Sequence, residues 1–375
     1  MKCKTILATA VLLTFFVPPL SSKTKNRDRP IKGEWDFEPV KVWQINQAGE
    51  DVFGHPFSLR ISERGKLYIF DTRNEINYIF DSEGNFIKQF AKRGQGPGEV
   101  SGQGRTFLVN DTVIISGMTG FHYFTSEGDY LRTARQTGSN LPPHLFLNED
   151  ELIAAPLTGY HTPEGKGKIL LQNLKLGSEK VMTDFSSFEG GVGRSGEQLF
   201  DIVVIGLSPL LTIGQGHKKI YWGMSDSYLI HIADLEGNEV DSFSINRKPA
   251  RISNRKKKEY FGRSDLPADA LSQIINSFPN ALTHFHRIEM HNGLIYVFVP
   301  ELDMEARRAR IRQVDIFSPE GKYLYRAKFE LEEGLKLLFS PLENLVIQGN
   351  FMVSACELED DTIVIVKHRI RLPEL

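Results

Sequence analysis

The chain has 375 residues, of which 41% are hydrophobic and 25% charged, a composition that excludes a disordered protein. Its length is large for one simple core and suits an architecture that divides its core among repeated modules. Lys and Arg total 45 against 47 Asp and Glu, and this net charge of −2 argues against a nucleic-acid binder held by phosphate neutralisation.

Residues 1–22 have the pattern of a secretory signal peptide. A basic start (1–4) is followed by an apolar run (6–17) and by the segment Pro-Pro-Leu-Ser-Ser (18–22). The run is too short to cross a hydrocarbon core of about 30 Å as a helix. We therefore expect cleavage after Ser22, a secreted or periplasmic protein with no membrane span, and a linker over 23–34. The alternative is a buried N-terminal helix. Cleavage would leave Cys356, in an apolar run, without a cysteine partner in the chain.

The segment 57–99 contains four short apolar runs, FSLRIS, KLYIF, INYIF and FIKQF, separated by ERG, DTRNE and DSEG. Such runs, rich in aromatic and β-branched residues and bounded by turn residues, predict four consecutive antiparallel strands. A single meander cannot bury both its faces, so we expect the unit to recur.

The unit does recur. Its second strand has six copies, at 67–70, 113–116, 152–155, 220–223, 295–298 and 363–366. The Glu-Gly turn between its third and fourth strands recurs at 82–85, 126–129, 235–238 and 319–322. Irregular repeats of four short strands predict an all-β fold, a six-bladed β-propeller with four-stranded blades over 35–375. The last blade lacks a strand while 40–45 is a spare one, so pairing the two would close the ring and cover an exposed edge.

One part of this unit resembles an NHL repeat. The residues that carry the resemblance are 67–71, Asn74, 79–81, Gly84 and the GQGPG segment at 94–98. The whole chain is also similar to the secreted six-bladed propellers of Bacteroidetes-type bacteria, most of which have no assigned activity. NHL repeats usually carry an Arg where this chain has Ile76, so the role of that Arg is not transferred.

The connections between strands differ in length in a regular way. With the strands of a blade named a to d from the axis outward, the a–b and c–d loops lie on one face of the disc, here called the short-loop face. The b–c and d–a loops lie on the other, the long-loop face, and they include 91–104, 135–143, 157–168, 186–206, 247–282 and 300–312. Long connections gathered on one face of the disc predict that this face carries the function. The alternative is that neutral insertions accumulated in loops that tolerate them.

The longest of these connections is predicted to contain a helix. In 268–278 the apolar residues Leu271, Ile274, Ile275 and Phe278 form one helical stripe. We expect this helical insertion, 247–282, to pack over the rim of blades 4 and 5.

Basic residues gather in the same loops. Segment 247–263 contains eight Lys and Arg against Glu259, and Arg307, Arg308, Arg310 and Arg312 follow in the b–c loop of blade 5. The electrostatic fields of these two segments should add, which favours as ligand an anionic small molecule, an anionic glycan or an acidic protein surface. The alternative is a solvated helix face. Our main hypothesis is a monomeric binding scaffold without a cofactor, and the candidate ligand-binding residues are Arg105, Arg255, Lys256, Lys257, Lys258, Arg307, Arg308 and Arg310.

Histidines support a second hypothesis. His55, His144, His284 and His286 lie at or near the first strands of blades 1, 3 and 5, and three His around an open position are typical of catalytic zinc. The segment 141–145 resembles the ligand segments of peptidyl-hydroxyglycine lyases, six-bladed propellers in which three His bind zinc. This resemblance implies a zinc-dependent lyase or hydrolase at the channel mouth as the alternative function. The competing interpretation is that the histidines are packed or solvated.

Overall fold

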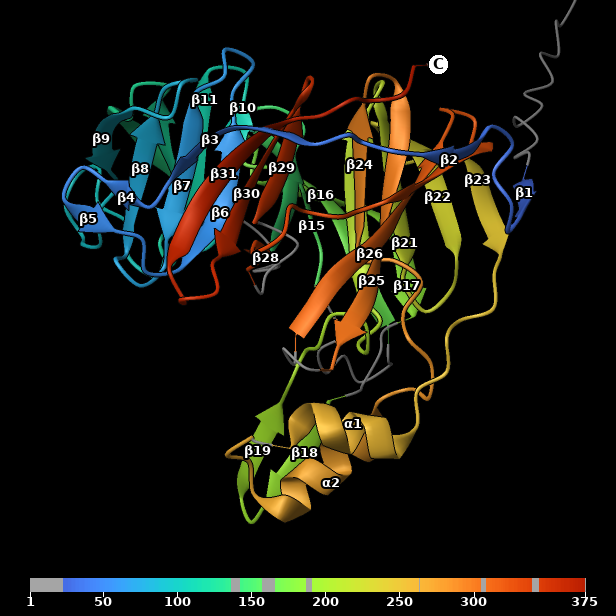
Figure 1. Cartoon of the computed structure of the whole chain (residues 1–375). Coiled ribbons are helices and arrows are strands. Elements are labelled where there is room, and N and C mark those ends of the chain that lie inside the picture. The colour runs from blue at the N-terminus through green and yellow to red at the C-terminus, as the bar shows by residue number, and fades with distance from the viewer. Residues whose placement is uncertain are drawn as a thin grey trace, which may run out of the picture.

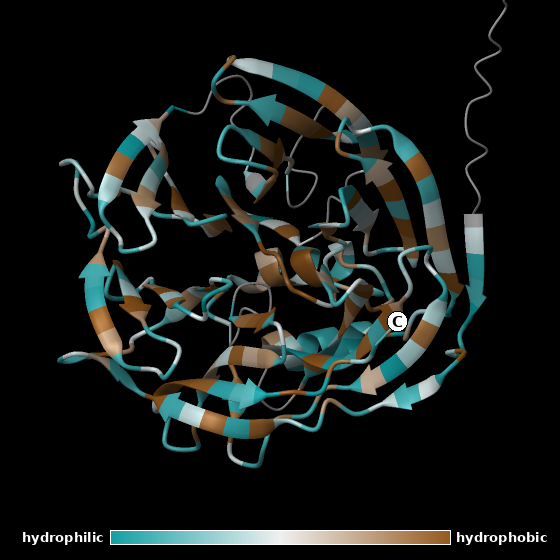
Figure 2. Ribbon diagram, turned by 90° about the horizontal axis from the view of Figure 1, so that it is seen from above, coloured by the Kyte–Doolittle hydropathy of each residue, from teal (hydrophilic) through white to brown (hydrophobic). Residues whose placement is uncertain are grey.

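Six β-sheets stand around a common axis like the blades of a propeller (Figure 2). The computed structural model describes residues 23–135, 142–156, 166–186, 191–262, 264–304, 308–338 and 344–374. The predicted signal peptide lies outside this range. The prediction of a six-bladed, all-β fold is confirmed, with blades of four to five strands.

The first strand of each blade lies nearest the axis and the last lies at the rim. Blades 1 and 2 consist of β6 (Pro56–Ile61), β7 (Leu67–Asp71), β8 (Ile76–Phe80), β9 (Phe86–Phe90) and β10 (Thr106–Val109), β11 (Thr112–Gly117), β12 (Gly120–Thr125), β13 (Tyr130–Ala134). Blades 3 and 4 consist of β14 (Pro143–Phe146), β15 (Glu151–Ala154), β16 (Lys166–Asn173), β17 (Ser178–Ser186) and β20 (Leu211–Gly216), β21 (Lys219–Met224), β22 (Leu229–Asp234), β23 (Glu239–Asn246). Blade 5 consists of β24 (Arg287–His291), β25 (Leu294–Asp303), β26 (Arg308–Phe317) and β27 (Tyr323–Lys328).

Blade 6 combines the two ends of the chain, as predicted. It contains β29 (Leu345–Gln348), β30 (Phe351–Glu357) and β31 (Ile363–Arg369), with the short β28 (Lys336–Leu337) also paired to β30. Its outermost strand is β3 (Val40–Ile45), which pairs antiparallel with β31. The indole Nε1 of Trp43 donates a hydrogen bond to the carbonyl oxygen of Ser82 at 3.1 Å, which ties β3 to blade 1. The ring is therefore closed.

One copy of the repeat was assigned to the wrong strand. Residues 363–366 lie in β31, the third strand of blade 6, and the second strand is β30. In blade 6 the fourth strand comes from the other end of the chain, so no Glu-Gly turn marks the order of the strands. In the other blades that turn is present where predicted, and Gly84 and Gly237 adopt positive φ angles of 86° and 85°, which glycine tolerates best.

Residues 23–34 form strands rather than the expected linker. β1 (Lys23–Arg27) pairs parallel with β23, and β2 (Gly33–Trp35) pairs parallel with β27, so blades 4 and 5 each gain a fifth strand. The outer strand of a blade has unpaired backbone groups that a polar segment can satisfy without an apolar pattern. Between the two strands, Asp28 accepts from Arg247 at 2.7 Å and from Arg326 at 2.5 Å. Together with β3 of blade 6, residues 23–45 thus span blades 4, 5 and 6.

The core consists of apolar side chains packed between neighbouring blades. One cluster joins Leu59 and Ile69 of blade 1 to Val353 and Ile365 of blade 6, and all four are fully or almost fully buried. The alternation of hydrophobic and polar residues along the strands is visible in Figure 2. Each blade therefore depends on its neighbours for burial of its faces.

The elements outside the blades lie mainly in connections of the long-loop face. They are the small β4 (Gln47–Ala48) and β5 (Asp51–Val52), the hairpin of β18 (Val192–Ser195) and β19 (Gln198–Asp201), and the helices α1 (Asn254–Phe261) and α2 (Ala268–Ser277). Within the described residues, neither helix has the length and hydrophobicity needed to cross a membrane.

Candidate functional site

β18, β19, α1 and α2 form a small subdomain that projects below the disc (Figure 1). They come from two connections of the long-loop face, between blades 3 and 4 and between blades 4 and 5. The subdomain has its own hydrophobic cluster, which includes Tyr260, Phe261, Ile274 and Ile275. Leu302, from the long β25–β26 hairpin of blade 5, joins this cluster and connects it to the disc.

The predicted helix over 268–278 is confirmed as α2, which ends at Ser277, before Pro279. Its expected position is corrected, because it packs against β18 and α1 in the subdomain and not over the rim of blades 4 and 5. The close approach to β18 requires glycine at position 193. A Cβ atom there would lie 2.3 Å from the carbonyl oxygen of Ala270, closer than any real contact.

Lys257 is a structural residue of this subdomain and not part of an exposed patch. Its side chain is 0% exposed, and its ammonium group donates to the carbonyl oxygen of Phe278 at 2.7 Å and to Oδ1 of Asn280 at 3.0 Å. A third acceptor, the carbonyl oxygen of Ile275, lies at 3.4 Å. A cation is favourable at the C-terminus of a helix, where carbonyl groups lack helical partners. Burial lowers the pKa of Lys257.

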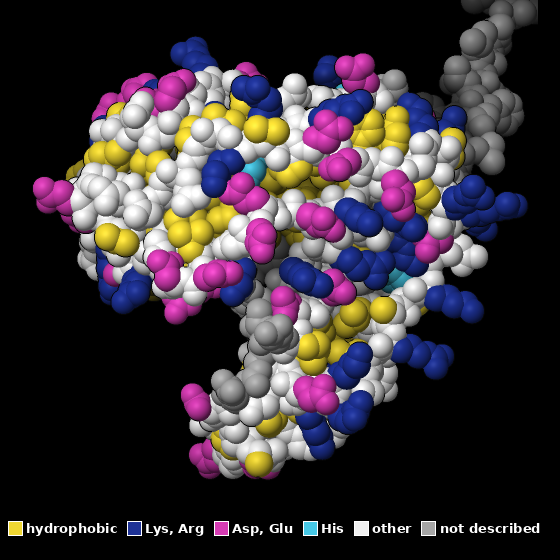
Figure 3. Space-filling view, viewed as in Figure 1, with side chains coloured by type: hydrophobic (Ala, Val, Ile, Leu, Met, Phe, Trp, Pro, Cys, Tyr) yellow, Lys and Arg dark blue, Asp and Glu magenta, His cyan; other side chains and the backbone are white. Residues whose placement is uncertain are grey.

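The other basic residues of α1 are exposed. α1 begins at the N-cap Ser253, whose hydroxyl accepts from the backbone N–H of Lys256, and its sequence turns Arg255, Lys256 and Lys258 outward. Arg255 is 84% exposed, and its contact with Glu259 at 3.9 Å is long for an ion pair. Lys and Arg side chains occupy the outer side of the subdomain and of the disc above it (Figure 3).

Of the three candidate residues of the blade 5 hairpin, the structure describes the side chain of Arg310. Arg310 is paired with Glu301 across the hairpin, with 2.9 Å between Nη2 and Oε2. Arg307 lies outside the described residues, and so does the side chain of Arg308. The candidate surface on the long-loop face is therefore Arg255, Lys256 and Lys258, which we call the α1 basic surface.

The four candidate zinc ligands separate into two groups. His144 and His286 line the central channel, whereas His55 and His284 do not. His55 bonds through Nδ1 to the hydroxyl of Thr72 at 3.0 Å, and the ring of His284 packs edge-on against Tyr228. Among the described residues, no group of three or more His, Cys, Asp or Glu side chains is placed to hold a metal ion. The donors thus do not fit the zinc site that the resemblance implied.

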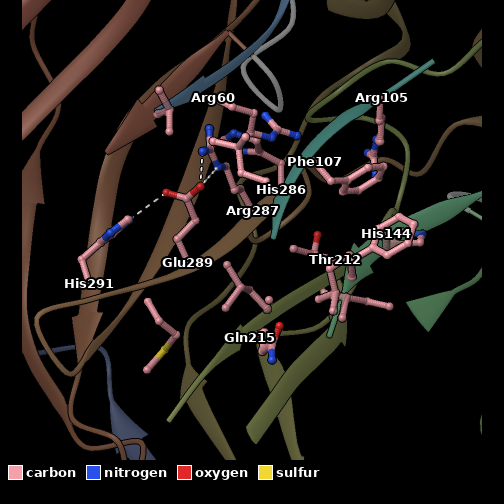
Figure 4. Close-up of a pocket in the computed structure, with 18 of the residues that line it drawn as sticks. Arg60, Arg105, Phe107, His144, Thr212, Gln215, His286, Arg287, Glu289 and His291 are labelled. Carbon is pink, nitrogen blue, oxygen red and sulfur yellow. Dashed lines mark hydrogen bonds and ion pairs between the residues drawn. The ribbon is translucent and has the colours of Figure 1, made fainter. Parts of the chain in front are cut away.

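The channel contains a cavity of about 460 Å³, lined by the innermost strands of all six blades (Figure 4). Arg105, assigned above to the ligand-binding set, lines this cavity and not the α1 basic surface. Burial and the neighbouring Arg105 lower the pKa of His144 to about 3, and burial and Arg287 lower the pKa of His286 to about 3. Both imidazoles are therefore neutral at neutral pH.

Glu289 is the one carboxylate among the described residues that line the cavity. Its Oε1 accepts from Nε of Arg287 at 2.8 Å, and its Oε2 lies 2.9 Å from Nε2 of His291. Burial raises the pKa of Glu289, but Arg287 and His291 together outweigh burial and lower the pKa to about 2. The carboxylate is ionised and held in place (Figure 4).

Several cavity residues were not predicted from the sequence: Arg60, Arg287, Glu289 and His291. A signal for three of them was present. The first strand of blade 5 reads RIEMH, and its alternate residues Arg287, Glu289 and His291 lie on one face of the strand. Charged residues at alternate positions of an innermost strand indicate a polar channel.

Comparisons with known proteins agree with this fold. A family model described as a 6-bladed beta-propeller (DUF5128) matches residues 50–115. The chain is a six-bladed propeller. Solved structures similar to it include BF0058 of Bacteroides fragilis NCTC 9343, provisionally described as an exported protein, with 13% identity, a TM-score of 0.55 and coverage of 93% of this chain and 99% of that one. A member of the DUF4221 family from Bacteroides vulgatus ATCC 8482 has 11% identity, a TM-score of 0.56 and coverage of 90% and 99%. No curated protein matches the propeller's sequence.

Proposed function

We propose that this protein is a secreted or periplasmic binding scaffold that engages an acidic protein surface through the α1 basic surface. The observation that carries the proposal is the exposure of Arg255, Lys256 and Lys258 on a helix of the subdomain that projects from the disc. The apolar run and break of the first 22 residues support export.

The shape of this surface favours a protein partner over a small molecule. The basic side chains of α1 are exposed on one face of a helix, and the subdomain that carries them projects from the disc (Figure 1). None of the cavities described above is lined by α1, and an exposed helix face can contact an extended surface, whereas a small ligand is usually bound in a concave site. Binding residues are commonly carried by connecting segments that a rigid scaffold holds in position, and here the disc is the scaffold.

The charges of α1 set the expected strength and salt dependence. Glu259 is the one acidic residue of α1, so the helix carries a clear positive excess. Exposed ion pairs contribute about 0.2–1 kcal/mol each, so three of them supply roughly 0.6–3 kcal/mol. The interaction should therefore be salt-sensitive and should act mainly on the association rate.

A catalytic role receives no comparable support. Of the four histidines, His55 and His284 lie away from the channel cavity, and the described residues offer no metal-binding cluster. The zinc-dependent reaction is therefore not carried into the proposal.

The test replaces three charges on α1 and measures binding to a defined acidic probe. The variant Arg255→Glu, Lys256→Glu, Lys258→Glu should lose binding to poly-L-glutamate that the wild type shows by fluorescence anisotropy at low salt. Lys257 is left unchanged because it is buried and its ammonium group bonds to acceptors within the subdomain.

The matched control makes the same change of charge on the opposite face. Arg64, Lys175 and Lys218 are exposed and lie in turns of the short-loop face, so their replacement by Glu alters the net charge equally. This control should bind poly-L-glutamate nearly as well as the wild type. Equal losses of poly-L-glutamate binding in both variants would show that net charge alone causes the effect, and would refute the proposal. Binding to heparin without binding to poly-L-glutamate would also contradict a protein partner.

A further inference from the structure

A second cavity lies on the short-loop face, between blades 6 and 1, which stand side by side (Figure 1). Its volume is about 330 Å³, at the lower end of the range of small-molecule sites. Its wall includes turns of both blades, at Ser82 of blade 1 and Asn350 of blade 6. Strands of the two blades contribute the apolar side chains of Ile61, Leu67 and Val353. The cavity therefore lies where the two ends of the chain close the ring.

Two aromatic rings and one lysine lie next to one another in this wall. Trp43 of β3 and Val353 of β30 are both cross-strand partners of Lys367 in β31, so the three side chains share one face of the sheet. Phe351, two positions before Val353, lies on the same face. The ammonium group of Lys367 is 4.3 Å from the centroid of the Phe351 ring and 5.8 Å from that of the Trp43 ring. A ligand in the cavity would thus meet a cation and two rings together.

The charge of Lys367 is buried without a carboxylate beside it. The residue is 8% exposed, and its ammonium group donates a hydrogen bond to the carbonyl oxygen of Ser82 at 2.8 Å. Within the described part of the chain, no carboxylate forms an ion pair with it, and two of its three N–H donors have no acceptor. Burial lowers the pKa of Lys367, and the more distant Glu83 and Asp81 only partly offset burial. An anion that accepts from this ammonium group would compensate the buried charge.

From this arrangement we propose that the cavity between blades 6 and 1 binds a small aromatic monocarboxylate, with its carboxylate bonded to Lys367 and its ring packed against Phe351 and Trp43. This inference is independent of the partner surface on α1, which belongs to the long-loop face. A single buried ammonium group favours a monoanion. The other charged residues of the wall, Glu63 and Arg64, are exposed neighbours in one turn and have opposite charges.

The apolar part of the wall defines the rest of the ligand. Ring contacts between aromatic groups add to the free energy gained by burial of apolar area, which favours an aromatic ligand over a saturated one. The volume of about 330 Å³ leaves room for one ring with a short acid chain.

The same lysine also helps to close the ring of blades. The carbonyl oxygen of Ser82 accepts from Lys367 and from Nε1 of Trp43, which joins blade 6 to blade 1. A bound ligand would add contacts to both blades and should raise the melting temperature of the protein. A lysine that served only to close the ring would give no preference for a carboxylate, so the two roles can be distinguished by binding.

The experiment is isothermal titration calorimetry of the mature chain at neutral pH with three probes of equal size: phenylacetate, phenylacetamide and cyclohexylacetate. Phenylacetamide lacks the charge, and cyclohexylacetate lacks the planar ring. We expect phenylacetate to bind about tenfold or more tightly than phenylacetamide, because the amide loses the charged hydrogen bond. It should bind about threefold or more tightly than cyclohexylacetate. Failure of phenylacetate to bind, or equal or tighter binding of either analogue, would overturn the proposal.

The variant Lys367→Met keeps the apolar stem and removes the ammonium group, so it should abolish the preference for phenylacetate over phenylacetamide. The control Lys336→Met removes one positive charge from an exposed position of the same blade and should keep the wild-type preference. Melting without ligand checks that the variants fold. Should Lys367→Met melt early, Phe351→Leu tests the same cavity, since loss of the ring should reduce the preference for phenylacetate over cyclohexylacetate. A wild-type preference for the carboxylate in folded Lys367→Met, or unchanged discrimination between the two rings in Phe351→Leu, would overturn the assignment.

Discussion

The substitution Lys257→Met tests the structural role of the one buried lysine on α1. Methionine keeps the apolar stem but removes the ammonium group, which leaves the carbonyl oxygen of Phe278 and Oδ1 of Asn280 without this donor. Each hydrogen bond to a charged group contributes about 1.5–3 kcal/mol. The variant no longer buries a charge, which offsets part of the loss, so we expect a net destabilisation of the subdomain of about 2–3 kcal/mol.

The effect should be local, because the subdomain has its own hydrophobic cluster. Hydrogen–deuterium exchange of amides in α1 and α2 should accelerate about 30- to 150-fold, as about 1.4 kcal/mol corresponds to a factor of ten. Amides of the blades should exchange at the wild-type rate. Unchanged exchange in the two helices of a Lys257→Met variant would refute the assigned role.

The control is Lys256→Met on the same helix. Lys256 is exposed, and its side chain is not needed for the N-cap bond, which uses its backbone N–H. Substitution of an exposed residue away from such features usually changes stability by less than about 0.5 kcal/mol. Equal acceleration of exchange in both variants would show that any loss of positive charge destabilises the helix.

Three further predictions concern other parts of the chain. Gly193→Ala should separate β18 from α2, because the new methyl group meets the carbonyl oxygen of Ala270, and should cost about 1–3 kcal/mol, measured by the same exchange experiment. Asp28→Asn removes the ion pairs with Arg247 and Arg326 and should lower the melting temperature by the equivalent of about 1 kcal/mol, with faster exchange in β1 but not in blade 2. The pKa of His286 is about 3 in the fold, against about 6.5 for an ordinary histidine. Below pH 6.5 the unfolded chain takes up a proton that the folded protein does not, so the free energy of unfolding is highest above pH 6.5 and falls as the pH is lowered towards 3. At pH 5 the loss of unfolding free energy amounts to about 2 kcal/mol, which urea denaturation should detect. The variant His286→Gln should lack this loss, and an unchanged pH dependence in that variant would contradict the assignment.

The fold could be predicted because its signals are local. Strand runs and Glu-Gly turns repeat within each blade, and the positive φ of Gly84 and Gly237 is a property of a single turn. The roles of residues 23–34 could not be predicted in the same way. β1 and β2 pair with strands about 220 and 290 positions later in the chain. The sequence of β1, KTKNR, lacks the alternation of apolar and polar residues that predicts a strand.

The basic run of α1 shows why a cluster of charged residues in a sequence overestimates the number of charges that are exposed on the surface. Consecutive residues of a helix point in directions about 100° apart, so four basic residues in a row cannot all be exposed on a helix that packs one face against the protein. Lys257, Tyr260 and Phe261 are three and four positions apart and share the buried face. The helical period of the two aromatic residues could have identified Lys257 as the inward-facing member.

The residues of the channel are harder to predict because they meet only when the ring closes. Arg60, Arg105 and Arg287 belong to three different blades, and no spacing in the sequence relates them. His144 and His286 were identified for their metal-binding chemistry, and the structure brings them to the same cavity with the arginines. Their neighbours in the cavity include arginines, which a search for metal ligands does not reveal.

The most direct test of the proposed partner surface is hydrogen–deuterium exchange of the wild-type protein with and without poly-L-glutamate. We expect slower exchange in the segment that contains α1, residues 248–261, with no change in the turns of the short-loop face. Protection of the short-loop turns, or of the channel strands alone, would contradict the claim that the projecting subdomain binds an acidic partner.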